Sequence, residues 1–179
     1  FVGEVVGTNR ERVRTVAVCA RSAIADNFEY DLAGTPCQQV VGRKLCAYTS
    51  GVQQQFPDDR LLVDMGIESY LGMPLTDSAG QPLGLVAVMD GRPQGNPHLA
   101  ESMLRIFATR ASAELERRRV EDELATALRE RENLMETIPD IIYMLDLDGR
   151  MVSWNKKAER ITGFSAQELR DRPLADLFP

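Results

Sequence analysis

The chain has 179 residues, of which 44 % are hydrophobic and 27 % charged, the balance of a globular protein with room for one full domain and part of a second. Its net charge of -6 and its scattered Lys and Arg residues argue against a nucleic-acid partner. The longest apolar run, residues 83–89, is far shorter than the about 20 residues of a membrane-spanning helix, so direct membrane insertion is not expected.

The first half of the chain has the pattern of an antiparallel sheet. Residues 1–6 and 13–20 are β-rich runs separated by the polar segment GTNRER, which predicts a hairpin. Residues 21–57 are rich in Gly and Pro and contain two short candidate strands, FEYDL and LCAYTS. We expect this stretch to wrap the outside of the sheet.

A short helix and a second hairpin follow. Asp58 is a candidate N-cap for a helix over residues 59–65, and Gly66 suits the left-handed position after it. Residues 69–75 and 82–90 flank the turn segment TDSAGQ. The second of these runs is apolar almost throughout, which predicts a central strand that is buried on both faces.

A long helix is predicted from Asn96-Pro97, an N-cap followed by proline, because no Gly or Pro then occurs until Pro139. Its first half carries an apolar stripe that we expect to pack on the preceding sheet, formed by Leu99, Met103, Ile106, Phe107 and Ala111. Its second half is different, since residues 114–132 hold twelve charged residues among nineteen.

The polar half of this helix still contains a coiled-coil seam. At alternating steps of four and three, six of the eight positions from 113 to 138 are apolar. We therefore predict a homodimer through the C-terminal helix, with a seam of Val120, Leu124, Ala127, Leu134 and Ile138. The alternative is a solvated single helix held by charge pairs such as Glu114 with Arg118.

The last segment predicts two short strands and two short helices. IIYMLDLDGRMVSWN reads as a hairpin around Asp148-Gly149, Asn155 can cap a helix that Gly163 ends, and SAQE is a capping box. These elements bury little core, so this part should be the least stable. The chain starts without Met or a signal peptide and ends in a helical pattern, so we expect it to be a piece of a longer protein.

Thiol and imidazole groups are sparse. Cys19, Cys37 and Cys46 have no paired spacing, which argues against a disulfide framework and favours the reducing cytoplasm. The single His98 lies at the start of a predicted helix, and no C-x-x-C or H-x-x-x-H spacing exists. We predict neither a metal site nor a cofactor.

Several phrases in order carry a family resemblance. NFEYDLAGTPCQQVVGRKLCAY, FPDDRLLVDMGIESYLGMPLTDSAGQPLGLVAVMD and LRIFATRASAELERRR resemble a GAF domain, and more narrowly the GAF sensors upstream of bacterial histidine kinases or diguanylate cyclases. IPDIIYMLDLDGRMVSWNKKAERITGFSAQEL resembles the N-terminal half of a PAS domain. The implied order is a GAF domain without its first helix (1–116), a coiled-coil-like linker (117–137) and a partial PAS domain (138–179).

The GAF resemblance implies an α+β fold, with an antiparallel sheet of about six strands, flanking helices and a loop-built pocket. The candidate pocket residues are Phe28, Tyr30, Cys37, Cys46, Tyr48, Phe56, Tyr70 and Met73. The alternative is that these side chains are core residues around a pocket that binds nothing. Cyclic-nucleotide-binding GAF domains carry an N-K-x-F phrase that is absent here, and no His stands beside Cys46 for bilin attachment.

The resemblance implies a sensory module in a cytoplasmic signal-transduction protein of the two-component or diguanylate cyclase type. Such a module binds a small molecule, or acts as a dimerising relay to a downstream PAS and output domain, and is not itself an enzyme. The alternative function is that of a free methionine-(R)-sulfoxide reductase, which shares the GAF fold. Cys46 follows GRKL near where that family keeps a cysteine, but LLVDMGIESYLG lacks the second thiol.

Overall fold

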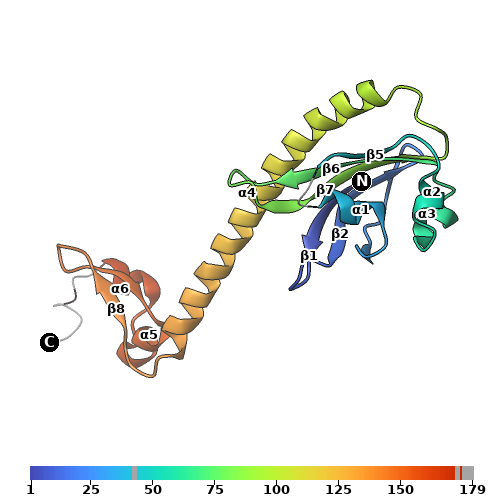
Figure 1. Cartoon of the computed structure of the whole chain (residues 1–179). Helices are drawn as coiled ribbons and strands as arrows, with labels where there is room; N and C mark the ends of the chain where they lie inside the picture. The colour runs from blue at the N-terminus through green and yellow to red at the C-terminus, as the bar shows by residue number, and fades with distance from the viewer. Residues whose placement is uncertain (42–43, 172–173, 175–179) are drawn as a thin grey trace. The chain divides into compact units, whose positions relative to one another are not determined.

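The computed structural model describes residues 1–41, 44–171 and 174. The chain divides into two compact units, Phe1–Arg119 and Val120–Pro179 (Figure 1). The first is an α+β unit built on an antiparallel sheet, and the second holds a small hairpin with short helices. In the described part of the chain, no helix is both long enough and apolar enough to cross a membrane.

The first unit contains a seven-stranded sheet in which β7 lies between β1 and β6. Its strands are β1 (Val2–Val6), β2 (Arg12–Ala20), β3 (Ala23–Ala25), β4 (Glu29–Asp31), β5 (Cys46–Tyr48), β6 (Ser69–Thr76) and β7 (Pro82–Asp90). The path runs β3-β2-β1-β7-β6-β5, and β4 also pairs with β2. Both predicted hairpins, β1–β2 and β6–β7, are confirmed.

The centre of the sheet depends on a close approach between two backbones. Gly84 of β7 lies opposite Glu4 of β1, and a Cβ on Gly84 would overlap the carbonyl oxygen of the preceding residue, Gly3. A strand position without a side chain is therefore required here. The predicted burial of the apolar run on β7 is confirmed for Leu83 to Ala87, but not for its end, where Val88 is 51 % exposed.

The Gly- and Pro-rich stretch holds more regular structure than its sequence indicated. Besides β4 and β5, it forms β3 and two helices, α1 (Pro36–Val40) and α2 (Val52–Gln55). Elements this short show no periodicity, so pattern reading missed them. The fully buried side chains of Val40 and Val52 fix the two helices against the sheet.

Helix α3 (Arg60–Asp64) confirms the short predicted helix, but its N-cap is Asp59 rather than Asp58. The Asp59 carboxylate accepts hydrogen bonds from the backbone N–H groups of Leu61 at 3.1 Å and Leu62 at 3.4 Å. The helix begins one residue later than expected, which places Asp58 too far out to cap it. Gly66 adopts the predicted left-handed conformation, with φ of 63°.

Helices cover both faces of the sheet (Figure 1). The short helices α1 to α3 pack on one face, over a core that contains Val13, Tyr70 and Leu85. The first half of α4 (Pro97–Thr137) covers the other face, where Leu71 and Val86 pack against it.

The prediction of which apolar stripe attaches α4 to the sheet is wrong. Leu99, Met103, Ile106 and Phe107 are exposed, and only Ala111 of that stripe packs on the sheet. The residues in contact with the sheet are instead Leu104, Ala108 and Leu115, together with Ala100 and Ala111. The helix carries two apolar stripes, and a sequence pattern does not say which of them the sheet will cover.

The second unit contains the end of α4 and four short elements, which are β8 (Tyr143–Leu145), β9 (Met151–Trp154), α5 (Lys156–Thr162) and α6 (Ala166–Asp171). The predicted hairpin around Gly149 is confirmed, and so is the capping box of Ser165 and Glu168. The buried core described here is only Met151, Ala158 and Leu169. Residues 172–173 and 175–179 of the predicted PAS segment lie outside the described part.

Candidate functional site

Most of the predicted pocket residues lie together under the short helices of the first unit. Cys37 and Tyr70 belong to the buried core there, and Tyr30, Cys46, Tyr48 and Phe56 pack against it. The rings of Phe28 and Tyr30 are 5.8 Å apart, those of Tyr48 and Phe56 are 5.3 Å apart in an edge-on arrangement, and Tyr48 is 6.3 Å from Tyr70. Phe1 joins this aromatic group, although its position at the edge of a predicted strand gave no sign of it.

Tyr70 and Cys37 form the polar centre of this group. The Tyr70 hydroxyl donates a hydrogen bond to the Cys37 sulfur at 3.3 Å, and both side chains are buried. Space for the Tyr70 ring comes from Gly72, because a Cβ at that position would overlap the Tyr70 hydroxyl and lie 2.7 Å from Val40. Burial raises the pKa of the Cys37 thiol, so the thiol stays neutral and poorly nucleophilic.

A small cavity borders Tyr30, Cys37 and Tyr70. It has a volume of about 20 Å³, enough for one water-sized molecule, and its wall is otherwise mainly apolar. The Tyr30 hydroxyl is buried, and the polar group beside it among the described residues is the Cys37 thiol. Burial is the main cause that raises the pKa of Tyr30, and the neighbouring Cys37 adds to it.

Asp59 brings a carboxylate to the same cavity. Burial raises its pKa, although the two backbone hydrogen bonds of the helix cap act in the opposite direction. The residues that line the cavity include this carboxylate and no Lys or Arg. The cavity therefore disfavours an anionic ligand.

Cys46 and Tyr48 lie on the outer side of the group rather than at the cavity. Tyr48 donates a hydrogen bond to Gln39 Oε1 at 2.9 Å, and the Cys46 thiol points to the same oxygen at 3.8 Å. Partial desolvation, with a contribution from Cys46, raises the pKa of Tyr48 to about 12.

Met73 is not part of this group. It lies on the opposite face of β6, in the core beneath α4, with Leu71 and Leu75. Successive side chains on a strand point to opposite faces, so Tyr70 and Met73, three residues apart, cannot line one pocket. Counting along the strand would have excluded Met73.

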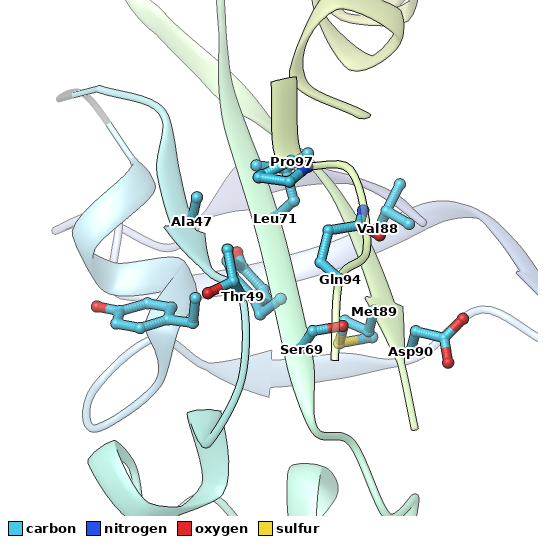
Figure 2. A pocket seen from close by; sticks show the side chains of 11 residues that line it. Ala47, Thr49, Ser69, Leu71, Val88, Met89, Asp90, Gln94 and Pro97 are labelled. Atoms are coloured by element: carbon cyan, nitrogen blue, oxygen red, sulfur yellow. The ribbon is translucent and has the colours of Figure 1, made fainter. Parts of the chain in front are cut away.

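A second hollow of about 70 Å³ lies where β5 and β7 end and β6 begins, beside the loop that leads into α4 (Figure 2). Polar residues that border it include Ser69, Asp90 and Gln94, and their hydrogen bonds hold the loop. Ser69 donates to the carbonyl of Arg92 at 2.7 Å, Asp90 accepts from the N–H of Arg92, and the N–H of Gln94 reaches Thr49. We assign it a structural role, since its polar groups hold the turn before α4.

The predicted dimer seam is open along the helix. Val120, Leu124 and Leu134 are 58 %, 60 % and 67 % exposed, and Ala127 is exposed as well. Ile138 lies just beyond the last helical residue, Thr137, and therefore not on the seam of the helix. The proline that follows it disfavours helical geometry at residue 138.

Asn155 connects the end of α4 to the hairpin of the second unit. Its side chain is fully buried; the amide donates to the carbonyls of Met135 at 3.1 Å and Asp140 at 2.9 Å, and the amide oxygen accepts from Ile142 N–H at 3.2 Å. The Asn155 side chain is thus turned away from the helix that it was predicted to cap. Both oxygens of Glu136, on the last turn of α4, accept from the N–H of Lys156 instead.

Neither a disulfide nor a metal cluster was found in the part that the structure describes. All three cysteines are free, with Cys19 exposed, Cys37 buried and Cys46 partly buried. No group of three or more His, Cys, Asp or Glu side chains among the described residues could hold a metal ion.

Comparisons with known proteins place these features in two families. The model of the GAF domain matches residues 5–115, and the model of the PAS fold matches residues 129–179. The hybrid signal transduction histidine kinase F of Dictyostelium discoideum is 25 % identical over 139 residues, which are 77 % of this chain and 12 % of that protein. Phytochrome B1 of Solanum lycopersicum is 40 % identical over 53 residues, which are 30 % of this chain and 5 % of that protein.

The chain therefore spans a small part of the length of the curated relatives it matches. Among solved structures, the crystal structure of the E. coli DhaR(N)-DhaL complex aligns with a TM-score of 0.38 and 18 % identity, over 74 % of this chain and 42 % of that one. The GAF model covers more than half of the residues, and the antiparallel sheet with its covering helices is consistent with it. The chain belongs to the GAF domain family, and a match to the PAS fold follows its GAF domain.

Proposed function

We propose that this chain is the sensory and relay module of a signal-transduction protein, in which α4 carries a change from the GAF sheet to the PAS segment. One observation carries the proposal. A single continuous helix, Pro97–Thr137, packs on the sheet through Leu104 and Ala108 at one end and is hydrogen-bonded through Met135 and Glu136 at the other. A helix held at both ends transmits a shift or rotation between them.

Strand β6 is the element that would pass the change from the pocket to the helix. Tyr70 points to the cavity side of this strand, whereas Leu71 and Met73 point into the core beneath α4. A ligand that displaces the Tyr70 ring must move β6 or its neighbours, because the ring fills the space above Gly72. The movement then reaches Leu104 and the rest of the helix contact.

The cavity wall suggests the class of ligand. Tyr30 supplies a buried hydroxyl, Cys37 a neutral thiol, and most of the remaining lining is aromatic or aliphatic. We propose a small, uncharged and mainly apolar molecule with one hydrogen-bonding group. Since the cavity holds about 20 Å³, binding requires α3 to move outward, and the ligand favours whichever state of the domain has the wider cavity.

We further propose that the module dimerises through Val120, Leu124, Ala127 and Leu134, and that its parent is a cytoplasmic kinase of the two-component type. The similarity to a hybrid histidine kinase supports this parent. A bacterial origin and a diguanylate cyclase output stay predictions from the sequence, since the two curated relatives named above, the histidine kinase and the phytochrome, are from eukaryotes. The reductase alternative places its reactive thiol at Cys46. Cys46 lies away from the cavity, with its thiol directed to Gln39 Oε1, and the segment LLVDMGIESYLG holds no second thiol, so this alternative is disfavoured.

The relay is tested by moving Tyr70 without any ligand. Gly72→Ala places a methyl group against the Tyr70 ring, whereas Gly95→Ala is a matched control, since nothing lies within 4 Å of its Cβ. Hydrogen exchange followed by mass spectrometry is measured over the whole chain. We expect Gly72→Ala to speed exchange in residues 120–137 and in β8 and β9 as well as in the sheet, and Gly95→Ala to change neither. If the effect of Gly72→Ala stops before residue 97, α4 is no relay.

A further inference from the structure

The turn between β6 and β7 holds α4 through hydrogen bonds at two successive helical turns. The N–H of Thr76 donates to the Ser112 hydroxyl oxygen at 3.2 Å. Four residues along the helix, one carboxylate oxygen of Glu116 accepts from both the N–H and the hydroxyl of Ser78, at 3.1 and 2.6 Å. The second distance is that of a short, charge-assisted hydrogen bond. Neither Ser78 nor Glu116 lines the cavity described above.

This contact lies where α4 leaves the sheet. Leu115, which is 4 % exposed, is the last buried residue of the helix, and residues 117–124 are exposed. The first compact unit ends shortly after Glu116, at Arg119. The buried apolar contact between helix and sheet therefore stops at Leu115, and Ser78 holds the helix at the next residue.

The β6–β7 turn does not need a hydroxyl at residue 78 for its own shape. Asp77 accepts hydrogen bonds from two backbone N–H groups of the turn, at 3.0 and 2.7 Å. The turn between β8 and β9 has the same arrangement around Asp146, at 3.0 and 2.8 Å, and there Leu147 stands in the place of Ser78. Loss of the Ser78 hydroxyl should therefore leave the turn intact and affect the helix.

We propose that Ser78 and Glu116 form a latch that fixes α4 to the β6–β7 turn where the helix leaves the sheet, and that opening this latch frees the residues that follow. Strand β6 carries Tyr70 at the cavity and ends at this turn, so a displacement of the strand reaches the latch directly. With the latch closed, the end of the sheet-bound helix moves with the turn. This consequence rests on the proposed relay, whereas the latch itself can be tested without it.

The chemistry of the latch is one carboxylate facing two donors. An ionised carboxylate accepts hydrogen bonds and donates none, so Glu116 needs both the N–H and the O–H of residue 78. A carboxylate at residue 78 removes the hydroxyl donor and sets two like charges beside each other, which repel. A negative charge at residue 78 therefore opens the latch, unless residue 116 is itself neutral and can donate a hydrogen bond.

Hydrogen exchange followed by mass spectrometry on the full chain tests the latch. Ser78→Ala removes the hydroxyl, and Ser102→Ala is the matched control, since the Ser102 hydroxyl donates to a carbonyl of its own helix at 2.8 Å. We expect Ser78→Ala to speed exchange in residues 111–119 by at least about threefold, the effect of one lost hydrogen bond, and Ser102→Ala to leave this stretch unchanged. Unchanged exchange in both variants overturns the latch.

A change of charge shows that the two side chains act on each other. Ser78→Asp should speed exchange in residues 111–119 more than Ser78→Ala does, because repulsion adds to the lost hydrogen bond. Adding Glu116→Gln removes the repulsion and supplies an amide that can donate to the introduced carboxylate, so exchange should return to within about twofold of the unmodified chain. Equal exchange in Ser78→Asp with and without Glu116→Gln contradicts this pairing.

The Gly72→Ala variant separates the latch from the relay. In a chain that also carries Ser78→Ala, we expect Gly72→Ala to change exchange in residues 120–137 less than it does with the latch intact. If Ser78→Ala frees residues 111–119 but the effect of Gly72→Ala stops before residue 97, the relay fails and the latch stands. If Gly72→Ala acts on residues 120–137 equally with and without the Ser78 hydroxyl, the latch is not on the path and the relay stands.

Discussion

At the scale of the residue, the candidate pocket depends on three neutral groups held away from water. Tyr70 is only 2 % exposed and Cys37 5 %, and the Tyr70 hydroxyl reaches the sulfur because Gly72 leaves room for the ring. The resemblance to GAF domains identified Tyr30, Cys37 and Tyr70 as candidates, since it implies a pocket in this part of the chain. It did not identify Gly72, whose contribution is the absence of a side chain.

These groups predict that the first unit loses stability in alkali. Burial raises the pKa of Cys37 above its ordinary 9.0 and that of Tyr70 above its ordinary 10.0, so the unfolded chain ionises first. The free energy of unfolding should therefore be level below about pH 8.5 and fall above it, by up to about 1.4 kcal/mol per pH unit for each such group. Urea unfolding followed by circular dichroism from pH 7 to about 11 measures this slope.

Two variants test whether the buried groups of the pocket cause this fall in the free energy of unfolding with pH. Tyr70→Phe removes one buried phenol and should flatten the fall in stability above pH 9. Tyr143→Phe removes a phenol that is 42 % exposed and should leave the slope as it is. Identical slopes in the two variants would contradict a role for the buried group.

At the scale of the element, α4 ends in a set of hydrogen bonds rather than in an apolar contact. Asn155 satisfies the carbonyls of Met135 and Asp140 and the N–H of Ile142, three backbone groups from successive parts of the chain. A buried amide that uses both its donors and its acceptor fixes their geometry more narrowly than an apolar side chain would. This makes Asn155 the residue that ties the helix to the hairpin β8–β9.

We therefore expect Asn155→Ala to release the last turn of α4. The change takes the side-chain partner from three backbone groups that are only partly buried, so the cost lies toward the lower end of the about 1–3 kcal/mol expected for a buried unsatisfied group. Amides of residues 135–142 should exchange at least about tenfold faster than in the unchanged chain. Asn133→Ala makes the same substitution at an exposed position of the same helix and should have no such effect. Equal protection in both variants would show that Asn155 does not hold the helix.

At the scale of the whole molecule, the two units differ in the size of their hydrophobic cores. In the first unit, two clusters of buried residues pack on the two faces of a seven-stranded sheet. In the second, the cluster among the described residues has only three buried members, Met151, Ala158 and Leu169. Because apolar burial supplies most of the favourable free energy of folding, the second unit should open at a lower free energy.

Native-state hydrogen exchange tests this difference directly. Amides of β8 and β9 should exchange through openings of lower free energy than amides of β6 and β7, at every urea concentration below the main transition. Limited proteolysis should accordingly cut first after residue 137. A common opening free energy for all four strands would contradict two units of unequal stability.

The sequence could predict those elements whose signals are local. Alternating and continuous apolar runs with Gly- and Asp-rich turns identified both hairpins of the sheet, and Asn96-Pro97 marked the start of α4. Gly66 and the capping box at Ser165 were likewise read correctly, because helix ends are set by the chemistry of a few neighbouring residues. Helices α1 and α2 were missed because they are too short to show a period.

The tertiary structure alone decided which of several equivalent surfaces became buried. Two apolar stripes on α4 are equally plausible from the pattern, and the sheet selected Leu104 and Ala108 and left Met103 and Ile106 exposed. The strand register likewise placed Met73 under the helix and Tyr70 at the cavity. Periodicity determined that α4 would be a long helix with apolar faces, whereas burial depends on partners distant in the sequence, which no local pattern contains.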